Sequence, residues 1–223
     1  LEPGRADILN TLGLVRQARC EWDAAEMAFH AAAKGVPMGQ PRAQIETNLA
    51  ALYMAQERFD VAAESCRAAI EAHPVYPQAH NILGAALKAA KDLNGAEAAF
   101  RKAYELDPTM TAAQVNLGTV FGMRRQWDDA LACYGRALEM SPDCAEAMNN
   151  RGNVLHSIGR FNEAEIDFEQ AISIDPEYAD PHLNLGLQLL MQGRWTEAWP
   201  EFEWRWRTPQ MEPFRRTFIE PQW

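Results

Sequence analysis

Apolar and small residues recur along this chain with the spacing of paired amphipathic helices. Between Ala145 and Pro176 they fall three or four residues apart over one helix length, pause at a short polar stretch, and then resume the same spacing. Because this spacing gathers them on one helical face, the stretch predicts two helices joined by a tight turn. The pattern returns every 34 residues. Four glycines mark the interval: Gly84, Gly118, Gly152 and Gly186.

The repeated positions carry residue types that suit close helix packing. We number each repeat so that Ala145 is position 1. Position 8 is small, and since a glycine inside a helix costs about 1 kcal/mol relative to alanine, we expect the second helix to approach closely there. Alanine at position 20 would form the matching surface, and position 24 is bulky in most repeats. Position 8 holds Gly13, Ala50, Gly84, Gly118, Gly152 and Gly186; position 20 holds Ala25, Ala62, Ala96, Ala130, Ala164 and Ala198; position 24 holds Phe29, Cys66, Phe100, Tyr134, Phe168 and Phe202.

A period this short predicts a stacked array of helix-turn-helix units. A three-residue insertion between Pro37 and Ala43 predicts a longer turn there. In the sixth repeat Thr196 is the expected N-cap, which would place Pro200 in the first helical turn. The expected repeats are 6–37, 43–74, 77–108, 111–142, 145–176 and 179–207. First helices are expected near 7–19, 43–56, 78–90, 111–124 and 145–158, and second helices near 23–34, 60–72, 94–106, 128–140 and 162–174.

The two ends of the chain depart from the repeat. Leu1-Glu2-Pro3 matches the end of a repeat, so residues 1–5 are interpreted as the tail of an upstream unit within an array of residues 1–207. Residues 208–223 carry no repeat and little helical pattern, which predicts an extended linker toward a further downstream domain. A repeat array needs polar caps, and neither end has one, so we expect self-association through an end.

This pattern resembles the tetratricopeptide repeat family over residues 6 to about 207. The resemblance implies an all-α fold, a right-handed superhelical solenoid of about six helix-turn-helix units. It also implies a protein–protein interaction scaffold. Such a scaffold would bind an extended peptide or partner segment in a concave groove lined by the first helices.

Composition narrows the classes of function. The formal net charge is −10, whereas a nucleic-acid-binding protein would need a basic stripe, so no nucleic-acid partner is expected. No apolar run approaches the length of a membrane span, so membrane insertion is not expected. The four cysteines occupy scattered repeat positions, which disfavours a disulfide framework or a zinc site and suits the cytoplasm. No catalytic or cofactor-binding motif is present, so we expect neither an enzyme in this chain nor a bound metal or cofactor.

One core position carries a charge. Position 7 is leucine in the other five repeats and Arg151 in the fifth. We interpret its aliphatic stem as packed in the core, with the guanidinium reaching an edge. A buried ion pair with a neighbouring acid is the second interpretation, and a ligand role is the third.

Asparagines line the first helices on the side opposite their packed face. At about 100° per residue, position 6 lies far from the apolar positions 4, 7, 8 and 11. Asparagine is a poor helix former, and its amide combines donors with an acceptor, which complements a peptide bond. The asparagines either bind an extended peptide or are simply common in such repeats. They are Asn48, Asn116, Asn150 and Asn184 at position 6, with Asn81, Asn149 and Asn153 beside them; Thr11 and Ile82 interrupt the row.

The end of this face is apolar, because Leu183, Leu187 and Met191 occupy it. These side chains would suit a hydrophobic side chain of a peptide or protein partner. Chaperone-binding members of the family hold a terminal carboxylate with a clamp of lysines on the first-helix inner face. Here Lys88 is the marginal exception on a face without cations, so that class of partner is disfavoured.

Two finer resemblances concern the asparagines and the tail. The row is similar to the asparagine ladder in the superhelical arm of O-linked N-acetylglucosamine transferases, with Ile82 as a gap. The stretch GRWTEAWPEFEWRWRTP, followed by FIEPQW, resembles the junction in bacterial proteins in which a repeat array precedes a glycosyltransferase-like domain. This implies an alternative function, the substrate-recruiting N-terminal arm of a protein glycosyltransferase whose catalytic domain lies beyond Trp223.

Overall fold

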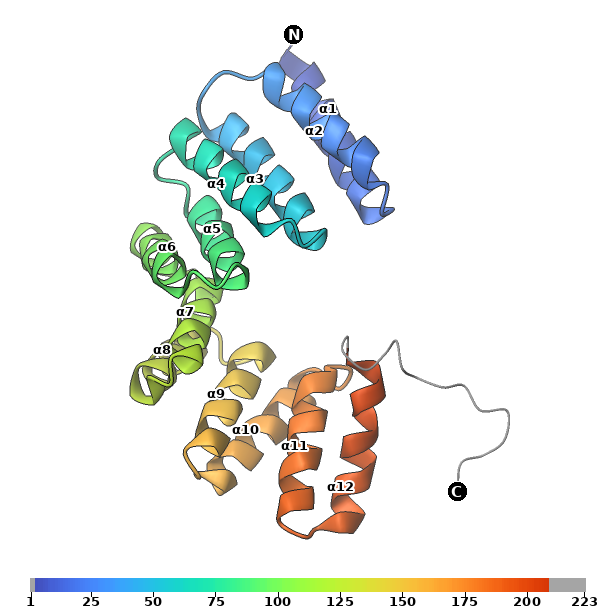
Figure 1. Cartoon of the computed structure of the whole chain (residues 1–223), viewed down its shortest axis with the longest axis vertical. Coiled ribbons are helices and arrows are strands. Elements are labelled where there is room, and N and C mark those ends of the chain that lie inside the picture. Colours follow the sequence, from blue (N-terminus) through green and yellow to red (C-terminus); the bar gives the residue numbers. More distant parts are fainter. Residues whose placement is uncertain (1–2, 209–223) are drawn as a thin grey trace, which may run out of the picture. The chain divides into compact units, whose positions relative to one another are not determined.

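The computed structural model describes residues 3–208, which form twelve α-helices, one 3-10 helix and no strand (Figure 1). The α-helices alternate in direction as helix-turn-helix pairs, which confirms the predicted all-α fold of six repeats. The first helices are α1 (Pro3–Ala18), α3 (Gln40–Ala55), α5 (Pro77–Ala89), α7 (Thr111–Met123), α9 (Ala145–Ser157) and α11 (Ala179–Met191). The second helices are α2 (Trp22–Lys34), α4 (Phe59–Ala72), α6 (Leu93–Leu106), α8 (Trp127–Met140), α10 (Phe161–Ile174) and α12 (Trp195–Phe202), and the 3-10 helix η1 covers Glu203–Arg207.

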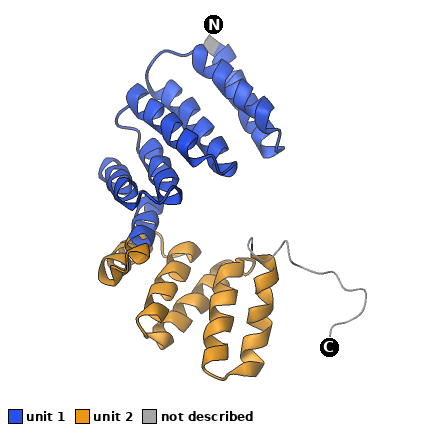
Figure 2. Cartoon of the chain, viewed as in Figure 1, with its two compact units in different colours: residues 1–120 blue, residues 121–223 orange. Residues whose placement is uncertain are grey.

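The chain divides into two compact units, residues 1–120 and residues 121–223 (Figure 2). In the N-terminal compact unit α1 packs on α2, α3 on α4 and α5 on α6, and α2 and α4 also contact the first helix of the next repeat. In the C-terminal compact unit α9 packs on α10 and α11 on α12, and α10 contacts α11. Each helix thus packs mainly on its neighbours in sequence, as in a stacked array. The hand of the superhelix stays a prediction.

The small residues at positions 8 and 20 mark where the helices of a repeat meet. A Cβ added to Gly84 would lie 2.6 Å from Phe100 Cε1, and one added to Gly152 would lie 2.6 Å from Phe168 Cε1. In these two repeats position 8 is therefore small because the aromatic ring at position 24 lies directly against the first helix, whereas Gly186 of the sixth repeat lies against the backbone of Phe202. The alanines at position 20 are all fully buried: Ala25, Ala62, Ala96, Ala130, Ala164 and Ala198.

The turn inside each repeat depends on one residue with positive φ at position 15. The value is 58° at Glu57 and 80° at Gly159. The following N–H closes the turn, as where the Arg160 backbone N–H donates to Leu155 O over 2.9 Å. Four repeats place a residue other than glycine in this left-handed conformation, which glycine adopts most easily. The position-15 residues are Cys20, Glu57, Lys91, Arg125, Gly159 and Gly193.

Two helices begin earlier than the sequence predicted. Helix α3 starts at Gln40 with Pro41 in its first turn, so most of the insertion lengthens this helix rather than the preceding turn. Proline suits the first turn because its missing N–H has no partner there. Helix α1 starts at Pro3, so residues 3–5 belong to its first turn, and the upstream unit stays a prediction. The interpretation of residues 1–2 and the predicted linker over 209–223 lie outside the described residues.

The sixth repeat differs from the prediction at its second helix. Helix α12 begins at Trp195, so Thr196 lies inside the helix rather than at its N-cap. Pro200 consequently lies in the second turn, where its missing N–H removes a helical hydrogen bond. The α-helix ends at Phe202 and continues as η1.

The E-W-R-W segment, which suggested the junction with a downstream domain, packs on the sixth repeat. The ring of Trp204 stacks on His182, with centroids 4.0 Å apart and planes 5° from parallel. The guanidinium of Arg205 lies 4.3 Å from the centroid of the Phe202 ring, and Arg207 Nη1 lies 2.7 Å from Glu177 Oε2. These contacts give the segment a structural role within the array.

The cysteines should differ sharply in reactivity. Burial raises the pKa of the Cys66 thiol to about 12, so it stays protonated near neutral pH, whereas Cys20 is exposed. Because the thiolate is the reactive species, we expect iodoacetamide at pH 8 to alkylate Cys20 and to spare Cys66. Peptide mass spectrometry of the folded chain measures this. Alkylation of Cys66 at the rate seen in denaturant would contradict its placement in the core.

Candidate functional site

The predicted asparagines pair with one another across successive first helices. Position 6 of an even-numbered repeat donates to position 5 of the odd-numbered repeat before it. Asn48 Nδ2 lies 2.9 Å from Asn10 Oδ1, and Asn184 Nδ2 lies 2.9 Å from Asn149 Oδ1. The third pair is longer, with 3.4 Å between Asn116 Nδ2 and Asn81 Oδ1. Part of the asparagine row is therefore explained by contacts between repeats.

In the N-terminal compact unit the pairing uses part of the hydrogen-bonding capacity of the asparagine amides. Asn116 donates to Asn81 and accepts from Lys88 Nζ over 3.0 Å. Asn48 is half-buried and donates to Asn10, and Ile82 interrupts the row as the sequence predicted. Because an amide has two N–H donors and two acceptor lone pairs, Asn116 keeps one of each beyond these bonds, and its role in holding a peptide stays a prediction.

The C-terminal compact unit leaves more of its asparagine amides available. Asn149 is only 3% exposed and contacts Tyr178 Oη as well as Asn150 and Asn184, so it supports the row from beneath. Asn150 accepts from Asn149 over 3.5 Å, and Asn153 is exposed. Within residues 3–208, no recorded hydrogen bond uses Asn150 Nδ2, Asn184 Oδ1 or the side-chain amide of Asn153. A donor and an acceptor thus face solvent on adjacent helices.

The predicted apolar residues form a stripe along α11. They lie four residues apart, so they share one helical face. Leu183 is half-buried, Leu187 is 43% exposed and Met191 is 72% exposed. Exposure therefore increases toward the C-terminal end of the helix, where the stripe offers contact area to a partner.

Two carboxylates lie at the opposite end of the same face. Glu146 is in the first turn of α9 and Asp180 is in the first turn of α11. Burial, followed by the charges of Asp180 and Glu146, raises the pKa of Tyr178 to about 12. Both carboxylates are therefore close enough to act on one phenol. We give the name α9–α11 face to the surface of these two helices that carries Glu146, Asn150, Asn153, Asp180, Leu183, Asn184, Leu187 and Met191.

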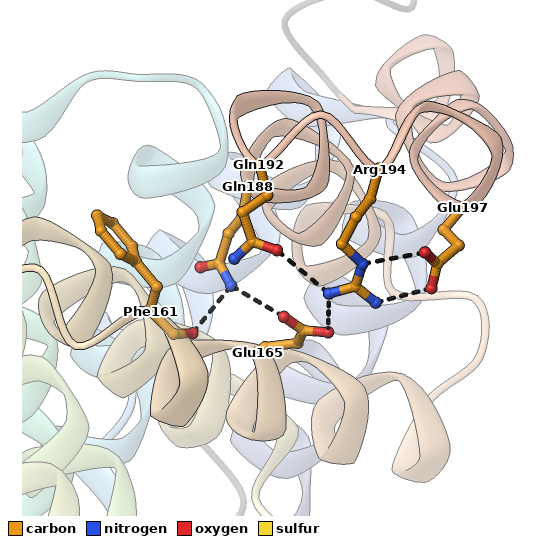
Figure 3. A network of polar contacts seen from close by, with 6 residues as sticks. All are labelled: Phe161, Glu165, Gln188, Gln192, Arg194 and Glu197. Atoms are coloured by element: carbon orange, nitrogen blue, oxygen red, sulfur yellow. Dashed lines mark hydrogen bonds and ion pairs between the residues drawn. The ribbon is translucent and has the colours of Figure 1, made fainter.

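A polar network holds the C-terminal half of α11 in place (Figure 3). Gln188 is buried, and its Nε2 donates to Phe161 O over 2.9 Å and to Glu165 Oε2 over 3.5 Å. Arg194 Nη1 lies 2.7 Å from Glu165 Oε1. Two further bonds join Arg194 to Glu197, and they contribute most to raising its pKa.

The network joins the fifth and sixth repeats and holds the apolar stripe of α11 in a fixed place relative to α9 and α10. His156 Nδ1 lies 3.1 Å from Gln188 Oε1, so α9 is joined to α11 beside the turn. Leu187 precedes Gln188 in the chain and therefore projects from a backbone fixed to α9 and α10. No clear pattern in the sequence indicated this network, because Gln188 and Arg194 occupy positions that vary among the repeats.

Arg151 forms an ion pair with Asp167, which confirms the second interpretation of this residue over the first. Its Nε and Nη2 contact Asp167 Oδ2 and Oδ1 over 2.7 and 2.6 Å. The side chain of Asp167 is 4% exposed and that of Arg151 is 30% exposed. The hydrogen bond to Asp167 is the main cause that raises the pKa of Arg151.

A pocket of about 350 Å³ opens beside this ion pair. Arg160 and Glu163 form a second ion pair at its edge, and Leu131 and Ile166 supply apolar walls. Since each guanidinium already contacts a carboxylate, the four charges balance. In residues 4–208 no cluster of histidine, cysteine and acidic side chains could hold a metal ion.

Comparison with known protein families identifies the repeat and indicates only a general function. The tetratricopeptide repeat model matches residues 47–111 and 115–179, and a second such model matches 168–199. A search of curated protein sequences found no match. No described helix has the length and apolar character needed to cross a membrane.

Solved structures of similar fold cover most of the chain. PilF of Pseudomonas aeruginosa superposes with a TM-score of 0.76 at 17% identity, over 95% of this chain and 96% of that one. A tetratricopeptide repeat protein of Thermus thermophilus gives 0.69 at 21% identity, over 83% and 99%. The Cut9–Hcn1 structure gives 0.81 at 14% identity, over 95% and 42%. These likenesses establish the fold and do not single out the arm of the O-linked N-acetylglucosamine transferases.

Proposed function

Because the chain belongs to the tetratricopeptide repeat family, whose repeats generally serve as protein–protein interaction scaffolds, we propose that it binds an extended partner segment on the α9–α11 face. Asn150, Asn153 and Asn184 hold the backbone of that segment. Leu183, Leu187 and Met191 receive its apolar side chains. Asn149 takes no direct part, because it is buried beneath the row.

The observation that carries the proposal is the unused amide capacity on neighbouring helices. Asn150 offers its Nδ2 donor and Asn184 offers its Oδ1 acceptor, while Asn153 offers both. A peptide backbone presents the complementary N–H and C=O groups along its length. A segment held in this way gains affinity from its main chain and selectivity from side-chain contacts.

The test compares variants of the asparagine row with a matched control. Peptides are selected from a random displayed twelve-residue library on the folded chain and then titrated by calorimetry. We expect Asn150→Ala with Asn153→Ala to weaken binding about tenfold, since each hydrogen bond contributes about 0.5–1.5 kcal/mol. Asn162→Ala is the control, because Asn162 is exposed on α10, outside the α9–α11 face.

Circular dichroism should show equal helical content in all three proteins. If the selected peptides bind the double variant as tightly as the unaltered chain, the asparagines are part of the repeat packing alone, and the partner binds elsewhere.

A further inference from the structure

We propose that the α9–α11 face selects a strand-like partner segment in which basic and apolar side chains alternate. This inference rests on the proposed function and adds the chemistry of the partner. Three features lead to it: the parallel course of α9 and α11, the placement of the asparagines between an acidic and an apolar edge, and the excess of negative charge.

The α9–α11 face has two chemically different edges. Helices α9 and α11 run in the same direction because both are antiparallel to α10, which packs on each of them (Figure 1). Their first turns, with Glu146 and Asp180, therefore lie along one edge. Their C-terminal halves lie along the other edge, which α11 makes apolar with Leu187 and Met191. The asparagine row crosses the face between these edges.

The geometry of an extended chain determines which sequence of the partner segment fits these two edges. In a strand the N–H and C=O groups lie in the plane of the strand, and successive side chains point to opposite sides of it. When one hydrogen-bonding edge of the segment faces Asn150 and Asn184, its side chains extend sideways. Alternate side chains then reach the acidic edge and the apolar edge, which favours an alternating basic and apolar pattern.

The negative charge around this edge determines that basic rather than acidic side chains of the partner are favoured. Among the described residues, neither Glu146 nor Asp180 forms an ion pair, and Arg207 is paired with Glu177, three residues before Asp180. Between residues 121 and 208 the sequence contains fifteen acidic residues, eight arginines and no lysine. A lysine or arginine of the partner gains attraction at this edge, whereas an acidic residue is repelled.

The apolar edge is held rigidly enough to discriminate. Gln188 and Arg194 tie the C-terminal half of α11 to α10, so Leu187 is presented on a fixed backbone (Figure 3). Met191 adds a flexible side chain that adapts to differently shaped apolar partners.

Three synthetic eight-residue peptides test the pattern. One alternates lysine and leucine, one alternates glutamate and leucine, and one places four lysines before four leucines. We expect the alternating lysine peptide to bind the unaltered chain about tenfold more tightly than either other peptide at low salt. Raising the salt to 1 M should remove most of the preference for lysine over glutamate, because the Debye length falls to about 3 Å.

Charge-reversal variants assign the preference to the acidic edge. Glu146→Lys with Asp180→Lys should favour the glutamate peptide over the lysine peptide. The control, Glu139→Lys with Glu169→Lys, changes the net charge equally on the exposed faces of α8 and α10 and should keep the original preference. Met191→Gln should weaken both alternating peptides alike, because it alters the apolar edge alone.

The outcomes separate this inference from the proposed function. Equal affinity for the three peptides, together with a loss of binding in the asparagine double variant, overturns the alternating pattern and leaves the asparagine row intact. An unchanged preference in Glu146→Lys with Asp180→Lys overturns the role of the acidic edge. Binding that ignores Asn150 and Asn153 overturns both.

Discussion

Replacing Phe168 with alanine should lower the free energy of unfolding by about 3–5 kcal/mol. The ring is about 1% exposed and lies against Gly152, where it fills the space between α9 and α10. Removing it takes away its apolar contacts and leaves a cavity that two rigid helices close poorly. Chemical denaturation followed by circular dichroism measures the change in midpoint.

The second repeat supplies a test of the same contact from the other helix. There position 8 is Ala50 and position 24 is Cys66, so the first helix gains a methyl group where the second helix has a smaller side chain. Gly152→Ala alone should cost about 1–3 kcal/mol because its Cβ meets the Phe168 ring. Combined with Phe168→Cys, the alanine should cost less than it does alone. Additive effects of the two changes would show that the ring and the glycine do not share one contact.

Replacing Asp167 with alanine should destabilise the chain by about 2–3 kcal/mol. The change removes both hydrogen-bond acceptors of Arg151 and leaves a guanidinium at a core position with 30% of its side chain exposed. That exposure lets water replace part of the lost interaction, which keeps the effect below that of a fully buried pair. Chemical denaturation of the full chain gives the difference.

The chain contains its own control for this ion pair. In the third repeat the equivalent residues are Leu83 and Ala99. Arg151→Leu with Asp167→Ala restores that combination, and its stability should equal or exceed that of the unaltered chain, because apolar replacements of buried ion pairs are often neutral or stabilising. A double variant as unstable as Asp167→Ala would mean that the charge pair is itself required for the packing of α9 on α10.

The helices could be predicted from the sequence, because the residue spacing that produces them is local and recurs in every repeat. Small residues at positions 8 and 20 identified the helix contact, and the structure adds that the ring of Phe100 or Phe168 occupies it. The predicted start of α12 was wrong because Thr196 is a favourable cap residue. The N-cap is instead Arg194, whose backbone N–H closes the turn as the equivalent residue does in every other repeat. Local preference was overruled by the packing of the repeat.

The candidate site was only partly predictable. The exposed stripe of α11 followed from helical spacing, and Leu187 and Met191 were identified correctly as exposed apolar residues. The burial of Asn149 was missed and the ion pair of Arg151 was only the second interpretation, because each depends on which neighbouring helix supplies a partner. The alternation of asparagine between positions 5 and 6 was visible in the sequence and could have signalled the pairing.

That alternation determines which repeats can be added to or removed from such an array without breaking an asparagine pair. Each amide pair joins an odd-numbered repeat to the even-numbered one after it. Excising the second repeat alone would bring Asn10 against Ile82. The isoleucine has no amide, so the lost hydrogen bond could not be replaced. Excising the third and fourth repeats together would instead bring Thr47 against Asn150, a junction of the kind the chain already has between even and odd repeats. The building block of this array is therefore a doublet, and duplications or designed truncations that respect it preserve every remaining asparagine pair.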